Sequence, residues 1–358
     1  MMAVTRPGRS GGSDRRGGRV DPVVDVHAHF LPLGAIHAAT TGQPWHGTRV
    51  ERSARGTPVL VTGDYRVGLG SAEYWNGPED RLATFTDAGV DVQVVSVTPP
   101  LFRYYLDAEE AIPAAHEVND ELRDWTTSWP ERYRGLATLP LQDVSASVDE
   151  LDRAVNELGL VGAAVGTHVN GENWDSPTLL PVLRAAEELG AMLFVHPAGS
   201  RVEAALPRYH MRNFIGNPFE TTVAIGSLIF GGVLDEVPDI KLVFAHGGGF
   251  ACADVGRFDH GYAVRPEARE YPELLPSEYL RRLYFDSLTH SAGALRYVID
   301  TVGADQVVLG TDYPADMGQE RPVDWISSCE GLSEQEKNGV LRDNVARLLR
   351  RDTLRPAS

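Results

Sequence analysis

The sequence predicts a (β/α)8 TIM barrel, an α/β fold in which eight parallel strands alternate with helices. Three observations lead to this fold class: short apolar runs recur eight times along 358 residues, helix-period segments separate most of them, and histidine or aspartate residues close several of the runs. Strands that are apolar throughout are typical of a parallel sheet covered on both faces. Alternating strands and helices in this number favour a closed barrel, which often occupies about 250 residues or more as one unit.

The eight predicted strands are rich in valine, leucine, phenylalanine and alanine. They cover residues 23–26, 92–97, 136–139, 162–165, 192–195, 242–245, 283–285 and 307–309. Between them, the clearest helical stripe consists of Val144, Val148, Leu151, Val155 and Leu158. Gly159 follows this stripe where a left-handed cap would end the helix.

Capping residues predict two further helices. The first is expected to begin with Ser176 as N-cap and Pro177 in its first turn, and to end at Gly190. The second, the last strong helix of the chain, is expected to begin at Ser333 with Glu336 as its capping-box partner. Both fit the alternation that a barrel requires.

Two segments fall outside the regular alternation. Residues 31–80 form the longest gap between strands and carry alternating runs at 59–61 and 65–67, so we expect an insertion with a small antiparallel hairpin. Because it follows the first strand, the insertion is predicted at the C-terminal face of the barrel, where barrel enzymes hold their active sites. Residues 1–22 carry five arginines and five glycines and are predicted to be a disordered basic tail. Residues 23–350 are then one barrel domain.

Composition limits the partners of the chain. Lysine and arginine number 33 against 50 aspartates and glutamates, a formal net charge of -17. This charge repels phosphate backbones and anionic membrane surfaces, and no apolar run reaches about 18 residues, so we expect neither a nucleic-acid nor a membrane partner. The only cysteines, Cys252 and Cys329, make neither a disulfide framework nor a zinc ribbon. A reducing, cytoplasmic location is therefore expected.

Histidine and aspartate residues close four of the predicted strands. His27 and His29 stand two residues apart at the end of the first strand, and the strand period of two directs both rings to one face. His196 ends the fifth strand, His246 the sixth and Asp312 the eighth. Because the C-terminal ends of parallel barrel strands meet at one rim, these five side chains are expected to lie together.

Three imidazoles and a carboxylate suit a single divalent metal ion. His27, His29, His196 and Asp312 are candidate ligands for zinc or a neighbouring first-row ion, with a position left for water or substrate. Bound metal lowers the pKa of water to about 7, and His246 is the candidate general acid/base beside it. Taken alone, His-x-His is a common chance pattern, and His-Gly-Gly-Gly is equally typical of a turn. Their joint placement with the other strand-end residues favours the metal site.

Seven further histidines lack such a pattern. His168 closes the fourth predicted strand and His290 follows the seventh. Either could line a pocket, although structural or surface roles fit equally well.

At these residues the chain resembles the amidohydrolase superfamily, specifically the decarboxylase branch typified by 2-amino-3-carboxymuconate-6-semialdehyde decarboxylase. The resemblance covers most of residues 22–350. It is carried by VDVHAHFLP, RYRGLATLPLQD, GTHVNGENWD, LFVHPAG, FAHGGGFACADVGRFDHGYAVRPEA, SEYLRRLYFDSLTHSAGALRYVID, ADQVVLGTDYPADMG and RDNVARLL. Many metal-dependent hydrolases of the superfamily have a carboxylated lysine after strand four, whereas residues 165–168 read VGTH. The absence of this lysine implies a mononuclear site.

The resemblance implies a carboxy-lyase, an enzyme that releases CO2 without an organic cofactor or O2. It implies one divalent metal ion per subunit, zinc before manganese, at the positions of His27, His29, His196 and Asp312. In the branch, the residue that matches His246 deprotonates the metal-bound water or relays its proton, so His246 and Asp312 are the expected catalytic residues. The implied partner is a small-molecule carboxylate, an unsaturated or aromatic acid, with 2-amino-3-carboxymuconate-6-semialdehyde first.

The resemblance also implies how the substrate is held. Arg66 matches a substrate-binding arginine, Arg257 matches one that the neighbouring subunit contributes, and Arg265 matches one that supports the pocket. Arginine's planar fork suits a carboxylate, although an arginine on a loop is by itself typical of a solvated surface. Tyr209 and Ala315 stand where the branch has a tryptophan and a bulkier aromatic, which leaves the substrate open. We expect a homodimer in which Arg257 acts in trans.

Three alternatives stay open. The same metal centre suits hydrolase or hydratase chemistry on a lactone, an amide or an unsaturated acid. Other members of the branch decarboxylate hydroxybenzoates of the γ-resorcylate or salicylate type. An inactive metal-binding or scaffold protein is disfavoured because His246 and every predicted ligand are present.

Overall fold

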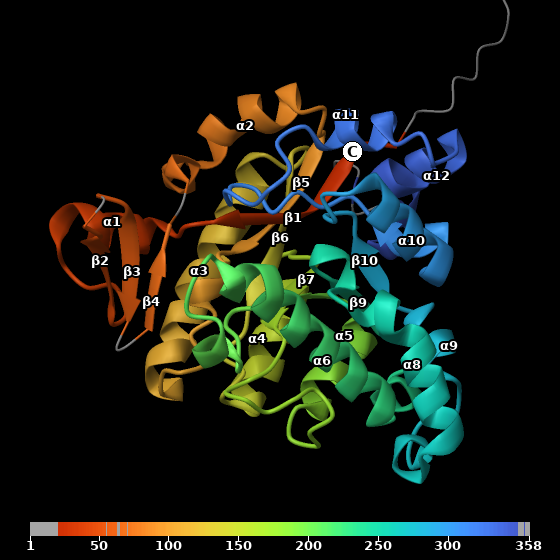
Figure 1. Cartoon of the computed structure of the whole chain (residues 1–358). Helices are drawn as coiled ribbons and strands as arrows, with labels where there is room; N and C mark the ends of the chain where they lie inside the picture. The colour runs from red at the N-terminus through yellow and green to blue at the C-terminus, as the bar shows by residue number, and fades with distance from the viewer. Residues whose placement is uncertain (1–20, 55, 63–64, 70, 350–353, 355–358) are drawn as a thin grey trace, which may run out of the picture.

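The centre of the molecule is an eight-stranded parallel sheet rolled into a barrel (Figure 1). The computed structural model describes residues 21–54, 56–62, 65–69, 71–349 and 354, so the basic tail predicted at residues 1–22 lies, up to residue 20, outside the described part. The strands are neighbours in the order β1-β5-β6-β7-β8-β9-β10-β11. The Val26 amide donates to the Leu309 carbonyl at 2.9 Å, which joins the first strand to the last and closes the barrel.

The barrel strands coincide with the eight predicted apolar runs. They are β1 (Val24–Phe30), β5 (Val92–Val97), β6 (Tyr133–Thr138), β7 (Gly162–Gly166), β8 (Met192–His196), β9 (Lys241–Phe244), β10 (Tyr284–Asp286) and β11 (Val307–Val308). All their residues are buried except Lys241 and Tyr284, which are half-buried. Parallel strands covered on both faces account for the continuous apolar sequence, and the predicted (β/α)8 fold is confirmed.

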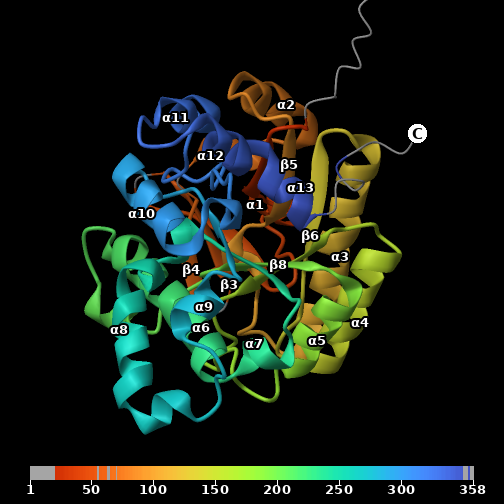
Figure 2. The same ribbon diagram turned by 90° about the vertical axis from the view of Figure 1, so that its right-hand side faces the viewer.

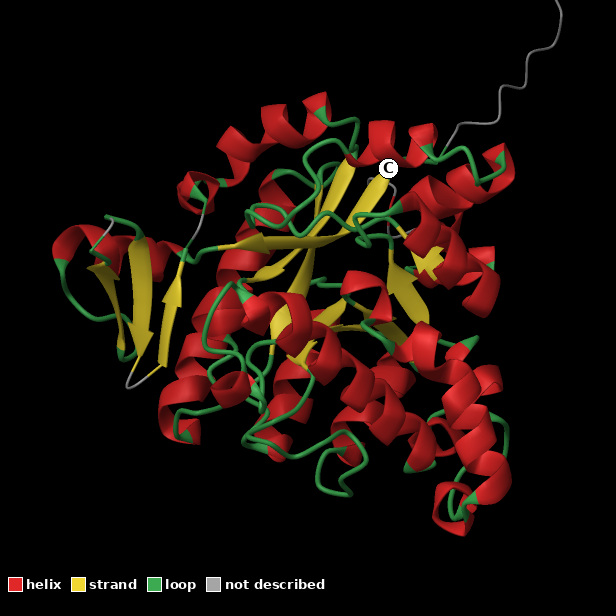
Figure 3. Ribbon diagram, viewed as in Figure 1, coloured by secondary structure: helices red, strands yellow, loops and turns green. Residues whose placement is uncertain are grey.

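Helices surround the barrel (Figures 2 and 3). The longer ones are α2 (Pro78–Asp87), α3 (Ala108–Ser128), α4 (Val144–Asn156), α5 (Leu180–Leu189), α6 (Asn217–Phe230), α8 (Ala251–Val264) and α10 (Ala292–Val302). The shorter ones are α7 (Val233–Glu236), α9 (Pro276–Leu280), α11 (Pro322–Ser328), α12 (Glu334–Asn338) and α13 (Asn344–Leu348). In the described part of the chain, no helix is both long and apolar enough to cross a membrane.

Most of the predicted helix boundaries are confirmed. Gly159 and Gly190 have φ of 70° and 62°, the left-handed conformation expected of a helix end. Ser333 caps α12 through a capping box with Glu336. The prediction that Ser176 is the N-cap of a helix is wrong, because α5 begins only at Leu180. The Ser176 hydroxyl accepts from the Thr178 amide at 3.2 Å in the turn before that helix, and it also donates to the Glu172 carboxylate.

The insertion at residues 31–80 contains more than the predicted hairpin. It comprises α1 (Leu33–Thr41) and an antiparallel sheet of β2 (Thr48–Arg52), β3 (Pro58–Thr62) and β4 (Tyr65–Gly68). The hairpin expected at 59–61 and 65–67 is β3 with β4, and β2 pairs with the other edge of β3. Figure 1 shows this small sheet to one side of the barrel.

Candidate metal centre

Four buried side chains converge at the C-terminal ends of the barrel strands. His27 and His29 lie on β1, His196 ends β8 and Asp312 follows β11, and one ligand atom of each lies within 4.8 Å of the others. The Nε2 atoms of His27 and His29 are 3.1 Å apart. Asp312 Oδ1 is 3.2 Å from the first and 3.1 Å from the second. The structure therefore brings the four predicted ligands together.

Hydrogen bonds at the second ring nitrogen orient all three histidines. Nδ1 of His27 meets Asp286 Oδ2 at 2.6 Å, Nδ1 of His29 meets Ser96 Oγ at 3.0 Å, and Nδ1 of His196 meets the Pro197 carbonyl at 2.9 Å. Carboxylates and carbonyls only accept, and the Ser96 hydroxyl itself donates to the Ala28 carbonyl, so each Nδ1 carries the hydrogen. Each Nε2 lone pair is then left for a metal ion, as histidine ligands require.

The donor atoms fit a single divalent ion. Nε2 of His196 is buried and has no hydrogen-bond partner in the described part of the chain, a situation that costs about 1–3 kcal/mol unless a partner is supplied. Metal–ligand bonds of about 2.0–2.2 Å place tetrahedral donor atoms roughly 3–3.5 Å apart, and the separations among His27, His29 and Asp312 fall in this range. A metal ion among the four groups would supply the missing partner of His196.

Burial and charge set the protonation of the cluster. Burial opposes a charge on His27, but Asp312 and Asp286 raise its pKa to about 10. Burial lowers the pKa of His29 to about 4 and holds the pKa of His196 well below its ordinary value. Although burial favours the neutral acid, the charge on His27 and hydrogen bonds from the histidines hold the pKa of Asp312 well below its ordinary value. A metal cation among these groups would supply the positive charge beside Asp312 and would bind His27 in its neutral form.

His246 approaches the cluster from the end of β9. Its Nε2 is 3.6 Å from Asp312 Oδ2, and its ring centroid is 4.9 Å from that of His196. His246 and Asp312 have φ of 56° and 58°, a left-handed conformation that costs about 1–3 kcal/mol in residues with a Cβ and persists where the surrounding structure imposes it. The structure therefore places the predicted acid/base beside the predicted carboxylate ligand.

The glycines after His246 allow the loop to pass close to its neighbours. A Cβ on Gly248 would lie 2.5 Å from the Phe285 ring, and a Cβ on Gly249 would lie 2.3 Å from the Pro218 carbonyl oxygen. Both glycines also have positive φ. The His-Gly-Gly-Gly segment is thus a tight turn, and this turn also positions His246.

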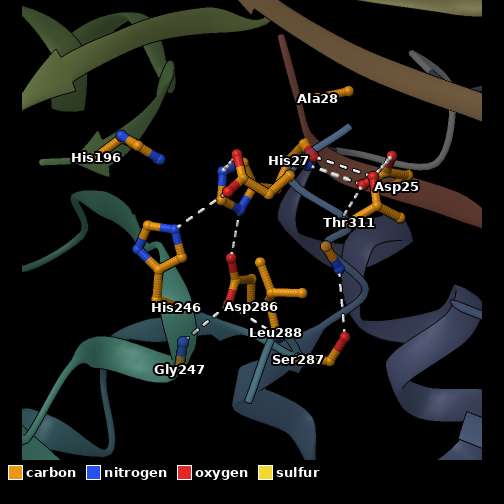
Figure 4. Close-up of polar contacts among 12 residues, drawn as sticks. Asp25, His27, Ala28, His196, His246, Gly247, Asp286, Ser287, Leu288 and Thr311 are labelled. Carbon is orange, nitrogen blue, oxygen red and sulfur yellow. Dashed lines mark hydrogen bonds and ion pairs between the residues drawn. The ribbon is translucent and has the colours of Figure 1, made fainter. Parts of the chain in front are cut away.

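Asp286, at the end of β10, is the site residue that the sequence analysis missed. Its carboxylate accepts from the Gly247 amide at 2.8 Å and from the Leu288 amide at 3.1 Å, besides its contact with His27. Figure 4 shows Asp286 between the His27 ring and Gly247. The sequence does contain a signal for this residue, because Asp286 is an aspartate at the end of the seventh barrel strand, just as Asp312 follows the eighth.

A cavity of about 460 Å³ opens beside His246 and Asp312. Its apolar wall includes Phe214, Leu288, Tyr297 and Val298. His290 and Asn213 add polar groups, and no lysine or arginine is among the described residues that line it. His290 thus lines a pocket, which is one of the two roles considered for it, and the cavity has an apolar wall next to His246.

The predicted substrate-binding residues lie outside this cluster in a single chain. Arg66 on β4 is exposed and its Nη2 is 2.5 Å from Glu51 Oε2. Arg257 is exposed on α8, and Arg265 at the end of α8 pairs with a neighbouring glutamate. Tyr209 is 77% exposed. None of the four lines the cavity beside His246, so their role toward substrate stays a prediction.

The fold and the metal-binding cluster define an amidohydrolase. The amidohydrolase family matches residues 24–351, and the chain belongs to this family. The chain is similar to the 2-amino-3-carboxymuconate-6-semialdehyde decarboxylase of Dictyostelium discoideum, with 37% identity over 329 residues that cover 91% of each protein. The gamma-resorcylate decarboxylase of Rhizobium sp. (strain MTP-10005) is 28% identical over 80% of this chain and 93% of its own length.

A solved structure agrees with the sequence relatives. The 5-carboxyvanillate decarboxylase from Sphingomonas paucimobilis matches with a TM-score of 0.78 and 25% identity, covering 93% of this chain and 99% of that protein. The resemblance predicted from the strand-end residues is therefore confirmed.

Proposed function

We propose that this protein is a metal-dependent, non-oxidative decarboxylase of an unsaturated or aromatic carboxylic acid. The observation that carries the proposal is the buried cluster of His27, His29, His196 and Asp312, with His246 beside it and an apolar cavity adjoining. The similarity to decarboxylases over most of the chain supports the reaction class. Of the possible substrates, 2-amino-3-carboxymuconate-6-semialdehyde is proposed first, because it is the substrate named for the 37% identical relative.

The proposed cofactor is one divalent metal ion per subunit, and no organic cofactor is proposed. Three imidazole nitrogens and one carboxylate oxygen suit zinc, with manganese second. When bound, the ion supplies Lewis-acid stabilisation of substrate oxygen and a water of lowered pKa. Asp286 acts as a positioning residue because it fixes the ring of His27.

His246 holds the proton that the reaction needs. In decarboxylation the bond between the carbon framework and the carboxylate breaks, its electron pair stays on the framework carbon, and CO2 leaves. That carbon must then receive a proton. His246 lines the cavity and lies next to Asp312, so its imidazole is placed to hold and deliver this proton.

Recognition of the carboxylate substrate is proposed to involve two subunits. Arg66 would exchange Glu51 for a substrate carboxylate, and Arg257 would reach the site of a second copy, with Arg265 and Tyr209 close to it. The homodimer is proposed from the resemblance alone. Phe250 on the turn before α8 is 39% exposed and Val264 at its end is 55% exposed, but these two side chains lie at opposite ends of the helix that carries Arg257.

A cytoplasmic location is proposed on the chemistry of the two cysteines. Cys252 and Cys329 are both buried and unpaired. Free thiols are typical of proteins kept in a reducing compartment.

The decisive experiment measures CO2 release from a panel of acids by the zinc-loaded protein. The panel contains freshly generated 2-amino-3-carboxymuconate-6-semialdehyde, γ-resorcylate and an unsaturated acid that a hydratase would accept. We expect CO2 from the first acid, and CO2 from γ-resorcylate alone would move the substrate to the hydroxybenzoates. Addition of water without any CO2 would contradict the proposed reaction.

A further inference from the structure

A second cavity, of about 240 Å³, lies at the ends of three barrel strands. Pro99 follows β5, Thr167 follows β7 and Ala198 follows β8, and all three line this cavity together with Arg103 and His168. These strand ends belong to the same face of the barrel as the metal cluster. The cavity is therefore within the active-site mouth, although it is separate from the one beside His246.

Arg103 is a buried cation that interacts with the charge of Glu117 but is in no direct ion pair with it. The residue is 4% exposed, and its Nη2 donates to the Thr48 hydroxyl at 2.9 Å while its guanidinium carbon lies 4.1 Å from the centroid of the Trp45 ring. Its Nε and Nη1 have no hydrogen-bond partner. Among the described residues, no carboxylate forms an ion pair with it. A buried guanidinium with unused donors is costly to the folded protein unless an anion is supplied.

Thr167 adds a second unused donor to the same cavity. Its side chain is buried and its hydroxyl has no hydrogen-bond partner among the residues that the structure describes. A hydroxyl and the remaining nitrogens of a guanidinium are groups that bind a carboxylate, and the guanidinium fork does so with two parallel bonds. The cavity therefore offers hydrogen-bond donors for an anion but no carboxylate of its own.

Short contacts connect this cavity to the metal cluster. Gly166, just before Thr167, pairs in the sheet with His196, a metal ligand. The amide of Gly166 donates to the hydroxyl of Tyr104 at 2.9 Å, and Tyr104 is the residue after Arg103. Neighbouring parallel strands are about 4.8 Å apart. Thr167 thus directly follows the residue that pairs with the metal ligand His196, which places this cavity next to the metal cluster.

We propose that Arg103 and Thr167 form a subsite for a second carboxylate of the substrate, the one that the product retains. This inference rests on the proposed function and narrows it: the substrate is a dicarboxylate. Arg66, which we propose binds the other carboxylate, is exposed and must first leave Glu51, whereas Arg103 is buried and is in no ion pair among the described residues. Arg103 is therefore a specificity-determining residue that sequence resemblance did not indicate.

Binding of unreactive diacids tests the subsite without relying on turnover. The probes are isophthalate and terephthalate, each compared with its monoamide, in which one carboxylate becomes a neutral group of the same shape. Calorimetry on the zinc-loaded protein should show diacids binding about 10- to 100-fold more tightly than monoamides, the range for hydrogen bonds to charged groups. Arg103→Met should reduce this ratio to about one, and Arg103→Lys should retain part of it. Thr167→Val should lower it by a smaller factor.

The control is Arg123→Met, which removes an exposed arginine of α3 that pairs with Asp124, and it should leave the ratio unchanged. The subsite is overturned if the wild-type protein binds diacid and monoamide alike or binds neither. It is also overturned if Arg103→Met weakens both probes equally, the result expected of an arginine that only ties Trp45 and Thr48 to the barrel. Preference for the diacid in a protein that releases no CO2 from any acid would uphold the subsite while refuting the proposed reaction.

Discussion

The carboxylate of Asp286 holds His27 and the loop of His246 at the same time. One oxygen lies 2.6 Å from Nδ1 of His27, and the other accepts from the amide of Gly247 at 2.8 Å. A metal ligand and the proposed acid/base are therefore positioned by a single buried residue. Hydrogen bonds of this kind orient ligands and raise their basicity.

Replacement of Asp286 should weaken metal binding. Asp286→Asn keeps the shape of the side chain but loses the charge that favours a hydrogen on Nδ1 of His27, so we expect about 10- to 100-fold lower zinc affinity. Competition with a fluorescent chelator measures the change. Asp300→Asn, which alters an exposed carboxylate of α10, is the matched control. Wild-type affinity in Asp286→Asn would show that the contact does not orient the ligand.

Replacement of His246 should remove activity while the metal stays bound. His246→Gln loses the proton-transferring imidazole but leaves His27, His29, His196 and Asp312 in place, so CO2 release should fall by about 10²- to 10⁴-fold. Elemental analysis of the purified variant should still find one metal ion per subunit. Loss of the metal along with activity would instead make His246 part of the binding site.

Two inactive variants should restore each other if Arg257 acts in trans. A mixed dimer of one His246→Gln subunit and one Arg257→Met subunit has one site in which both residues are intact. Because random mixing makes about half of the dimers mixed, about a quarter of wild-type activity should be recovered. The subunits are mixed after mild dissociation and assayed for CO2 release. Activity that never rises above that of the separate variants would place Arg257 in its own subunit's site or outside the site.

The buried side chain of Glu121 should cause the free energy of unfolding to fall as pH rises. Burial raises its pKa from 4.5 to about 7, and its Oε2 accepts from the Leu33 amide at the start of α1. The folded chain therefore holds this proton more tightly than the unfolded chain, and the free energy of unfolding decreases as pH rises from about 4.5 through about 7. Glu121→Gln removes this loss and should be more stable than wild type at pH 8 by about 1–2 kcal/mol.

Urea unfolding at pH 5 and pH 8 measures this difference. Glu131→Gln, which replaces an exposed glutamate, should change with pH as the wild type does. If Glu121→Gln and wild type have the same free energy of unfolding at pH 8, the buried Glu121 carboxylate does not destabilise the folded protein.

The barrel and its metal ligands were predictable because both follow from local pattern. Strands buried on two faces are apolar throughout, and residues at their C-terminal ends share one rim, so His27, His196 and Asp312 could be assigned together. The strand β2 was not predicted, because its sequence TRVER places charged residues on an exposed face. A strand recognised by alternation needs one apolar face.

Other features depend on partners that are distant in sequence. The contact between Asp286 and His27 spans 259 positions, and no local spacing reveals it. The start of the helix predicted at Ser176 was also missed, because the Ser176 hydroxyl accepts from the Thr178 amide in a turn and α5 begins only at Leu180. Arg103 is unusual because it is buried and in no ion pair among the described residues, which is a property of packing and not of sequence pattern.

The most direct test of metal-dependent decarboxylation is to measure the mass of the product formed in D2O. Zinc-loaded protein and metal-stripped protein are each given 2-amino-3-carboxymuconate-6-semialdehyde, and their products are compared. The account predicts a product that has lost one CO2 and gained one deuterium on carbon, formed only by the loaded protein and restored when zinc is returned. A product that keeps every carboxylate and gains water, or equal turnover without metal, would contradict it.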